Sequence, residues 1–433
     1  MTVRVIGGGL AGVEAAYALA NQGIAVTLYE QKPVKRSAAH SMDTLAELVC
    51  SNSLKAERVE SAAGLLKAEM AMLGSLCVPT AYECRVPAGG ALAVDREEFS
   101  RRITEKIQTH PLIDCVYEEV TDIPTDGYTI IATGPLTEGI LARRLADFFG
   151  CEALHFYDAA APVVTAESID MDKAFFASRY NKGDDAAYLN CPMNEEEYNA
   201  FYGELISAQR AELHVVDKPN VYEGCMPVEI MAARGKDTLR YGPMKPVGLY
   251  HPVTDKRAYA VVQLRQENAQ GTLYNMVGFQ TNLKFGEQKR VFSMIPGLEN
   301  MDIVRYGVMH RNSFIDSPKA LDASYRVRFR QNLYIAGQLS GVEGYMESAM
   351  SGLVAGISLA REIKGEKPLD LPPESMCGAL SRYISDPQVV NFQPMGANFG
   401  ILPPLEEKIR DKKLRYEALA QRGLVALENA LRQ

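Results

Sequence analysis

The first thirty residues show the hydrophobic pattern of a strand, a helix and a second strand. Val3 to Ile6 is a short apolar run rich in β-branched residues, and positions 10–22 are alanine-rich with helical periodicity. Gly23 can end that helix in a left-handed cap, and Ile24 to Tyr29 is the next apolar run. The pattern predicts a βαβ unit at the start of the chain.

Later segments continue the alternation. Helices are predicted from about Ala46 to Leu73 and from Arg96 to Gln108, and Tyr128–Pro135 is typical of a buried parallel strand ending in glycine. Between Thr165 and Asn312 the segments become shorter and richer in Gly, Pro and Tyr, as expected of an inserted domain.

The βα pattern then resumes towards the end of the sequence. Asn332–Gln338 is a predicted strand that ends in glycine, and Glu347–Ile363 is a predicted helix rich in small residues. A linker follows at Pro368–Pro373, and Lys408–Arg432 is a predicted terminal helix with an apolar side.

The turn between the first strand and helix carries a glycine fingerprint. Gly7 permits a sharp turn, Gly9 lets the backbone approach a pyrophosphate, and Gly12 allows the helix to pack closely on the strand. Glu30, 23 positions after Gly7, is placed to accept hydrogen bonds from an adenosine ribose. The predicted dinucleotide site comprises Gly7, Gly8, Gly9, Leu10, Ala11, Gly12 and Glu30.

Two further glycines favour FAD over NAD as the bound dinucleotide. Strands ending in Thr133-Gly134 and in Gly337-Gln338 occur at the spacings of flavoproteins related to glutathione reductase, and Gly344-Tyr345 opens the helix that would face the flavin. We see no second nucleotide fingerprint for NAD(P)H. The sequence predicts an α/β fold: a discontinuous Rossmann-like FAD-binding domain, 1–165 and 313–433, with an inserted α/β domain, 166–312.

Composition and charge limit the cellular compartment and the kinds of partner that we expect. The 433 residues include 46 Lys and Arg against 54 Asp and Glu, a net charge of −8 that by itself argues against nucleic acid. No apolar run approaches the roughly 18 residues of a membrane span, and the N-terminus lacks the cationic head of a secretory signal. We therefore expect a cytoplasmic protein without a membrane partner.

Eight cysteines are scattered without a C-x-x-C pair, which argues against a disulfide framework and a zinc site. No metal site is predicted. Cys50 lies beside small polar residues at a turn or helix start, and Cys225 lies between Gly and Pro. These two are better placed to react than the other six, which are expected to be core residues.

Long motifs from Val5 to Gly400 carry a family resemblance. The chain closely resembles the folate- and FAD-dependent tRNA (uracil-5-)-methyltransferases of the TrmFO family. The shared stretches are GGGLAGVEAAY, ELVCSNSLK, VPAGGALAVDREEF, IIATGPLT, FYDAAAPVV, YLNCPM, EGCMPVE, YGPMKPVGL, AVVQLRQENAQGTLYNMVGFQTNLK, RYGVMHRNSF, AGQLSGVEGYMESAMSGL and FQPMGANFG.

The resemblance implies methylation of uridine carbon 5 in the T loop of tRNA. The one-carbon donor would be 5,10-methylenetetrahydrofolate, and NAD(P)H would regenerate FADH2. Because uracil carbon 5 is a poor nucleophile, a thiolate adds to carbon 6 and the resulting enolate attacks the one-carbon unit. By motif, Cys225 is the candidate nucleophile and Cys50 the second thiol, acting as base or protecting the site, although the roles can be exchanged.

The resemblance also indicates folate contacts. His310 would stack on the pterin, and Tyr345 would border the same space. Candidates for the folate carboxylates are Arg265, Arg290 and Lys284, among which spacing does not choose.

RNA binding by an acidic protein requires local basic surfaces. One candidate, Arg234, Lys236 and Arg240, follows soon after Cys225 and, together with Lys245 and Asp237, carries a net +3. The other includes Lys412 and Lys413 in the stretch 408–415, with five cations and one Asp.

Four alternatives stay open from sequence alone. A paralogue could act on a ribosomal RNA uridine, and a related flavoprotein modifies wobble uridines but is longer, with a C-terminal helical region. A flavin oxidoreductase for a small molecule would not need Cys225. A flavin-containing RNA-binding protein without catalysis would need neither thiol. Oligomeric state and reductant preference are undetermined.

Overall fold

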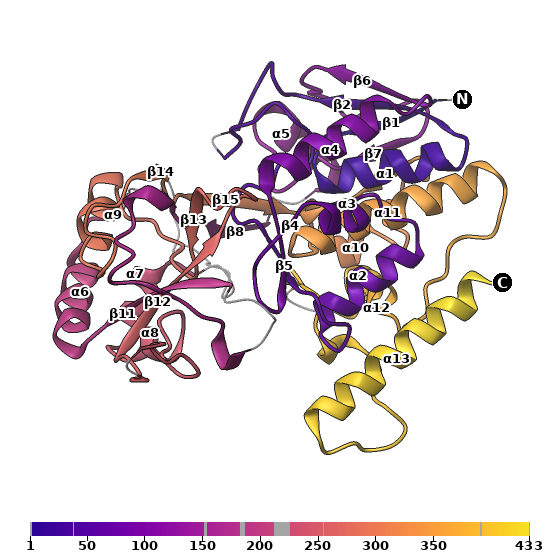
Figure 1. Ribbon diagram of the computed structural model, residues 1–433. Helices are drawn as coiled ribbons and strands as arrows, with labels where there is room; N and C mark the ends of the chain where they lie inside the picture. Colours follow the sequence, from indigo (N-terminus) through magenta and orange to yellow (C-terminus); the bar gives the residue numbers. More distant parts are fainter. Residues whose placement is uncertain are drawn as a thin grey trace.

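A computed structural model describes residues 2–37, 39–150, 154–181, 187–211, 226–253, 255–389 and 392–432 (Figure 1). Cys225 and Cys151 lie outside the described residues, as does the side chain of His310.

A five-stranded parallel sheet organises the first part of the molecule. Its order is β16-β7-β1-β2-β6, and every neighbouring pair is parallel. The strands are β1 (Thr2–Ile6), β2 (Ala25–Glu30), β6 (Ile113–Tyr117), β7 (Thr129–Ile131) and β16 (Leu333–Ile335). The sheet is therefore completed by a strand from the last quarter of the chain, as the resumed βα pattern predicts.

Helix α1 (Leu10–Asn21) packs against α11 (Tyr345–Ile363), although more than 300 residues separate them along the chain (Figure 1). The contact is close because α11 carries glycine at the crossing. A Cβ added at Gly352 would lie 1.9 Å from the Ala11 carbonyl oxygen, and one at Gly356 would lie 2.8 Å from that of Ala15. The small residues thus allow helix-to-helix backbone contact.

The remaining helices and a small sheet surround this centre. The helices are α2 (Ala62–Met72), α3 (Cys77–Glu83), α4 (Arg96–Gln108), α5 (Gly139–Phe149), α10 (Ser317–Ala320), α12 (Met376–Tyr383) and α13 (Lys412–Leu431). The three-stranded sheet has the order β3-β5-β4, with β3 at Ser53–Ala56, β4 at Arg85–Val86 and β5 at Ala91–Val94.

A six-stranded antiparallel sheet with its own hydrophobic core forms the second part of the molecule (Figure 1, left). Its order is β10-β11-β12-β13-β9-β14, with strands β9 (Val163–Thr165), β10 (Phe175–Phe176), β11 (Tyr188–Met193), β12 (Ala260–Gln266), β13 (Leu273–Met276) and β14 (Ile303–Arg305). Its helices are α6 (Glu195–Ser207), α7 (Val228–Ala233), α8 (Thr238–Tyr241) and α9 (Phe285–Phe292).

Strands β8 (Leu154–Ala159) and β15 (Met309–Phe314) join the two parts as an antiparallel pair. Because β9 pairs with β13 and β14, residues 163–165 belong to the second sheet. The predicted domains are 1–165 with 313–433, and 166–312. We propose the same two domains with the first boundary moved to just before β9.

Several predicted elements match the structure. The helix Arg96–Gln108 has the predicted bounds and is capped by Asp95, whose carboxylate accepts from the Glu98 amide at 3.1 Å. Gly23 is left-handed, with φ of +80°. The terminal helix begins at Lys412 rather than Lys408, because the Asp411 carboxylate accepts from the Leu414 amide at 2.9 Å and fixes the first turn there.

The predicted helix from Ala46 to Leu73 is wrong in its first half. Only α2, which starts after the Ser61 cap, is helical, while the preceding segment is irregular chain followed by β3. Ala46 and Lys55 have left-handed φ values of +51° and +63°, which a helix cannot contain. Cys50 therefore lies in an irregular segment, with no helix starting at it.

In the described part of the chain, no single helix is long and apolar enough to cross a membrane. By length and composition only, α2 and α3 pass that test as a pair, bent by 111°. Within this protein both helices contribute buried side chains to the core, among them Leu65, Leu66 and Val78.

Candidate dinucleotide and thiol site

The glycine turn after β1 has the geometry that the fingerprint predicts. Gly7 has φ of +104°, and a Cβ at Gly12 would lie 1.7 Å from the Gly7 carbonyl oxygen, so Gly12 is required for packing. A Cβ at Gly9 would meet nothing within 4 Å. Gly9 is the N-cap of α1, and no described side chain caps that end. The turn is therefore an open cradle of backbone N–H groups that fits a pyrophosphate.

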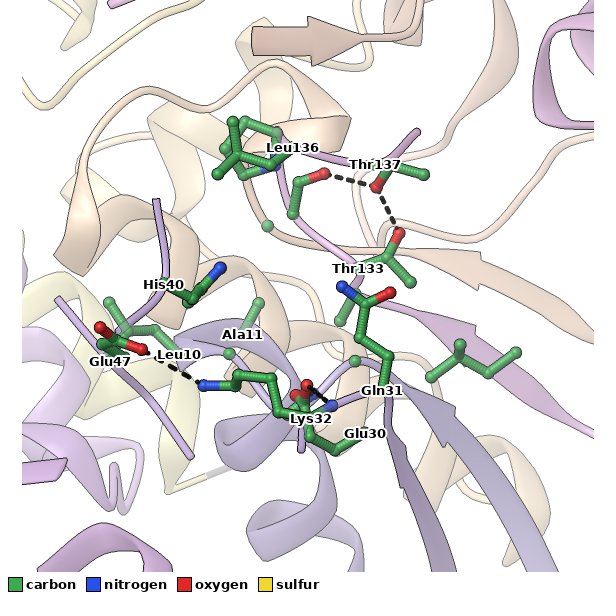
Figure 2. A pocket seen from close by; sticks show the side chains of 18 of the residues that line it. Leu10, Ala11, Glu30, Gln31, Lys32, His40, Glu47, Thr133, Leu136 and Thr137 are labelled. Atoms are coloured by element: carbon green, nitrogen blue, oxygen red, sulfur yellow. Dashed lines mark hydrogen bonds and ion pairs between the residues drawn. The ribbon is translucent and has the colours of Figure 1, made fainter. Parts of the chain in front are cut away.

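Glu30 ends β2 beside this turn. Its carboxylate accepts from the Gly8 amide and from the Lys32 amide, both at 2.9 Å, as Figure 2 shows for Lys32. These bonds hold the side chain at the cavity wall and leave lone pairs for a ligand hydroxyl. This position suits the predicted ribose contact.

A buried polar cluster that the sequence did not reveal lies next to Glu30. The Lys32 ammonium donates to the Thr44 carbonyl at 2.7 Å and lies 3.5 Å from the Glu47 carboxylate, with both side chains at most 4% exposed (Figure 2). Burial, and secondarily the Lys32 charge, lowers the pKa of His40. Lys32, His40 and Glu47 line the same cavity as Glu30. Their contacts join positions 8 to 15 residues apart in an irregular segment, so no helix or strand periodicity in the sequence indicates them.

One cavity of about 1210 Å³ joins most of the predicted dinucleotide residues. It is lined by Gly7, Gly8, Gly9, Leu10, Ala11, Glu30, Thr133, Gly134, Gly337, Gln338 and Tyr345. Gly12 packs beneath it, and Gly344 lines a neighbouring cavity instead. The cavity extends from the end of β2 to the start of α11, as an extended dinucleotide requires.

The far end of the cavity is ordered by local hydrogen bonds. The Thr137 hydroxyl lies 2.7 Å from both the Thr133 hydroxyl and the Gly134 carbonyl oxygen (Figure 2). The Gln338 amide donates to the Glu343 carboxylate at 2.8 Å. The turn that follows β16 thus presents the Gln338 amide and the N-terminus of α11 to whatever occupies this end.

Cys50 lies at this end, against Tyr345. The Tyr345 hydroxyl oxygen accepts from the backbone amides of Cys50 at 2.7 Å and Ser51 at 3.2 Å, and it lies 2.9 Å from the Cys50 sulfur. Two accepted bonds occupy the oxygen lone pairs, so its own proton points to the sulfur. Burial raises the pKa of the Tyr345 hydroxyl well above its ordinary value, and Cys50 raises it further, which keeps the hydroxyl protonated as a donor.

The Cys50 segment is also anchored to the second sheet. Arg265 on β12 donates to the Asn52 side-chain oxygen at 3.0 Å and to the Ser51 hydroxyl at 2.9 Å. Its side chain is buried, and both bonds are internal, so Arg265 serves position rather than a folate carboxylate. The ion pair of Arg96 with Glu267 links the same two parts of the molecule.

A second cavity of about 1130 Å³ adjoins the first. The two share the lining residues Val49, Pro135, Leu136, Gln338 and Tyr345. The second is also lined by Cys50, Lys55, Gln280, Asn312 and Glu347. The Lys55 ammonium lies 2.8 Å from the buried Glu347 carboxylate, which also accepts from the Ala397 amide at 3.0 Å.

Four of the remaining cysteines are buried as predicted: Cys77, Cys84, Cys191 and Cys377. Burial raises the thiol pKa to about 11 at Cys84 and about 12 at Cys191, and well above the ordinary value at Cys77 and Cys377. Cys115 is half-buried, and burial raises its pKa also. A protonated thiol is not a nucleophile, which leaves Cys50 as the best placed cysteine among the described residues.

The other predicted ligand residues are only partly placed. The predictions for Cys225 and for the His310 side chain fall outside the described residues. Arg290 is exposed and pairs with Glu287 at 2.8 Å, and Lys284 donates to Gln209 at 3.1 Å. Neither lines the two cavities.

The predicted RNA residues lie on two surfaces. Arg234 and Lys236 are exposed, whereas Arg240 is engaged internally, 3.6 Å over the Tyr259 ring and 2.7 Å from the Asp237 carboxylate. On α13, Lys412 and Lys413 are exposed. The RNA contacts stay predictions.

The family model for glucose inhibited division protein A matches residues 2–367. The methylenetetrahydrofolate–tRNA-(uracil-5-)-methyltransferase TrmFO of Enterococcus faecalis is 57% identical over 422 residues, covering 98% of this chain and 97% of that protein. The protein of that name from Staphylococcus aureus strain N315 is 58% identical over 429 residues, covering 99% and 98%.

The solved structure of GidA from Aquifex aeolicus in its form I crystal has a TM-score of 0.70 at 17% identity, covering 99% of this chain and 76% of that one. At this identity the likeness concerns the fold, and it confirms the predicted α/β class. The chain belongs to the glucose inhibited division protein A family and, by its full-length relatives, to the TrmFO family.

Proposed function

We propose that the protein methylates carbon 5 of a uridine in the T loop of tRNA, with 5,10-methylenetetrahydrofolate as one-carbon donor and FADH2, regenerated by NAD(P)H, as reductant. The observation that carries the proposal is the position of Cys50, a thiol hydrogen-bonded to Tyr345 where the dinucleotide cavity meets a second cavity. Near full-length relatives that carry the name methylenetetrahydrofolate–tRNA-(uracil-5-)-methyltransferase support the same reaction.

FAD is the dinucleotide that the first cavity would hold. The Gly7–Gly12 turn and the α1 N-terminus would bind its pyrophosphate, Glu30 its ribose, and the turns after β7 and β16 its flavin end. When bound and reduced by NAD(P)H, the flavin would supply the hydride that converts a methylene to a methyl group. NAD(P)H would reach it without a nucleotide-binding domain of its own.

Cys225 and Cys50 would carry out the steps that do not involve the flavin. A thiolate must add to uracil carbon 6, and a base must remove the carbon 5 proton before the thiol is eliminated. We assign the addition to Cys225 and the second role to Cys50, whose sulfur is held by the Tyr345 hydroxyl. Because tRNA is matured in the cytoplasm, we expect the enzyme to act there.

The test is product analysis. The holoprotein is incubated with methylenetetrahydrofolate, NADPH and either a tRNA transcript or ribosomal RNA, and 5-methyluridine is measured by nucleoside mass spectrometry. We expect product in tRNA, and none from Cys50→Ala or Cys225→Ala variants that retain FAD. Cys115→Ala, on the half-buried thiol of β6, is the matched control and stays active.

The contrary outcomes are specific. Product only in ribosomal RNA would show that ribosomal RNA, and not tRNA, is the substrate. No product in either RNA would refute the proposed function. Full activity in both thiol variants would remove the thiol mechanism but keep the reaction.

A further inference from the structure

Two side-chain amides, those of Asn312 and Gln280, line the second cavity together with Cys50. Asn312 comes from β15, and Gln280 from the loop that joins β13 to α9. Both line the cavity that Cys50 and Tyr345 also line. Residues from three distant segments of the chain therefore face one space.

Asn312 is 3% exposed. Among the described residues, neither the Asn312 nor the Gln280 side-chain amide has a hydrogen-bond partner, and neither belongs to the fully enclosed unpaired polar atoms, so both reach the cavity that they line. A buried amide without a partner costs about 1–3 kcal/mol and is rare in folded proteins. The buried Asn312 amide and the half-buried Gln280 amide on one cavity wall indicate a ligand that supplies hydrogen bonds to both.

Both amides are held in place by their backbones. Asn312 is inside the β8–β15 ladder, in register with Phe156. The Gln280 carbonyl accepts from the Val228 amide at 2.7 Å, and the next residue, Thr281, donates its hydroxyl to Glu229 at 2.8 Å. Fixed backbones thus anchor both residues at the cavity wall.

A side-chain amide presents one acceptor and a two-proton donor side by side. This pattern complements a cyclic lactam, in which an N–H group neighbours a carbonyl oxygen. Uracil has this edge at N3 and O4, and a reduced pterin has it at N3 and O4 of its own ring. A carboxylate, which only accepts, would fit the N–H and repel the carbonyl.

We propose that Asn312, with Gln280 beside it, binds the lactam edge of a substrate ring in the second cavity and so positions that ring against Cys50. The inference rests on the proposed function for the identity of the rings, and the same geometry serves uracil or pterin. Asn312 is a positioning and specificity-determining residue that makes no bond to the reacting carbon.

The experiment uses the FAD-loaded protein and three variants, Asn312→Ala, Asn312→Asp and Gln280→Ala, with Gln388→Ala as an exposed control. Flavin absorbance and thermal unfolding monitor cofactor retention and folding. Steady-state KM and kcat are measured separately for a tRNA transcript and for methylenetetrahydrofolate, and tetrahydrofolate binding is followed by flavin fluorescence.

We expect roughly a tenfold or greater loss of kcat/KM for Asn312→Asp, a smaller loss for the alanine variants and none for Gln388→Ala. A rise in KM for tRNA alone assigns the amides to uracil. A rise in KM for the folate, with weaker tetrahydrofolate binding, assigns them to the pterin.

Unchanged KM and kcat for both substrates in folded, FAD-loaded Asn312 variants would overturn the inference. If the Asn312 variants do not fold, Gln280→Ala decides, and unchanged constants there overturn it equally. Failure of the wild-type protein to methylate RNA would instead count against the proposed function, because tetrahydrofolate binding by the variants is measured independently of turnover.

Discussion

The bond between Tyr345 and Cys50 is the most specific feature of the site at the scale of single residues. One hydroxyl satisfies two backbone amides and directs its proton to a sulfur at 2.9 Å. A hydroxyl that donates to a sulfur holds that sulfur in a fixed orientation and stabilises negative charge on it. The tyrosine therefore prepares the cysteine as well as bordering the cavity.

Tyr345→Phe should slow alkylation of Cys50 by iodoacetamide at neutral pH, because the hydroxyl that donates to the sulfur is lost. The variant also leaves two amides unsatisfied, a cost of about 1–3 kcal/mol in stability. Peptide mass spectrometry under reducing conditions measures the Cys50 rate specifically. Tyr383→Phe, which loses a 2.9 Å bond to the Gln393 carbonyl, is the control. Equal Cys50 rates in the two variants would contradict the assigned role.

Glu69 predicts a pH dependence of stability. Its buried carboxyl accepts from the Met376 and Cys377 amides at 2.8 Å, and burial raises its pKa from 4.5 to about 7. Between these values the folded state holds more protons than the unfolded state, so this contribution to stability is present below pH 4.5 and is lost as pH rises towards 7. The full effect is about 3 kcal/mol.

Glu69→Gln should therefore flatten the change in the free energy of unfolding between pH 5 and pH 8, while lowering stability at pH 5 because one helix amide loses its acceptor. Urea denaturation at the two pH values measures both effects. Glu417→Gln, on the half-exposed face of α13, should keep the wild-type slope. A Glu69→Gln slope equal to that of wild type would refute the assignment.

At the scale of elements, the crossing of α1 and α11 supports the cofactor cavity. Gly352 contacts the backbone at Ala11, and Leu10 and Ala11 line the cavity directly. Any displacement of α11 at this crossing is transmitted to the cavity wall, because packed interiors have few voids to absorb it.

Gly352→Ala should reduce the FAD content of the purified protein and lower its melting temperature. Its Cβ would lie 1.9 Å from the Ala11 carbonyl oxygen, so the helices must separate. Gly203→Ala, in α6 with nothing within 4 Å of the added Cβ, is the matched control and should be neutral or slightly stabilising. Normal FAD content in Gly352→Ala would show that the crossing can relax.

Arg265 on β12 links the second sheet to the segment that contains Cys50. Arg265→Ala should retain FAD yet lose most methylation, because Ser51 and Asn52 lose their bonds to the guanidinium and Cys50 its position. Flavin absorbance and 5-methyluridine formation measure the two properties. Arg290→Ala, at an exposed ion pair, should change neither. Equal loss of FAD and methylation would indicate general unfolding instead.

For the molecule as a whole, the sequence predicted those features that depend on residues close together along the chain. The glycine turn, Glu30 and the helix Arg96–Gln108 follow from spacing and capping within a few residues. The segment around Cys50 was mispredicted, because its Leu45, Leu48 and Leu54 are buried by distant elements and imitate a helical pattern. The Asn312 and Gln280 amides have no local signature, since only the fold brings them to Cys50.

The late position of β16 has a consequence for biosynthesis. Its partner β7 leaves the ribosome some 200 residues earlier, so at about 5–20 residues per second the parallel sheet waits roughly 10–40 s for its last strand. Gly337 and Gln338, which close the cofactor cavity, emerge directly after that strand. The nascent chain cannot complete its cofactor site until the second sheet has been synthesised, so flavin loading follows the synthesis of that sheet.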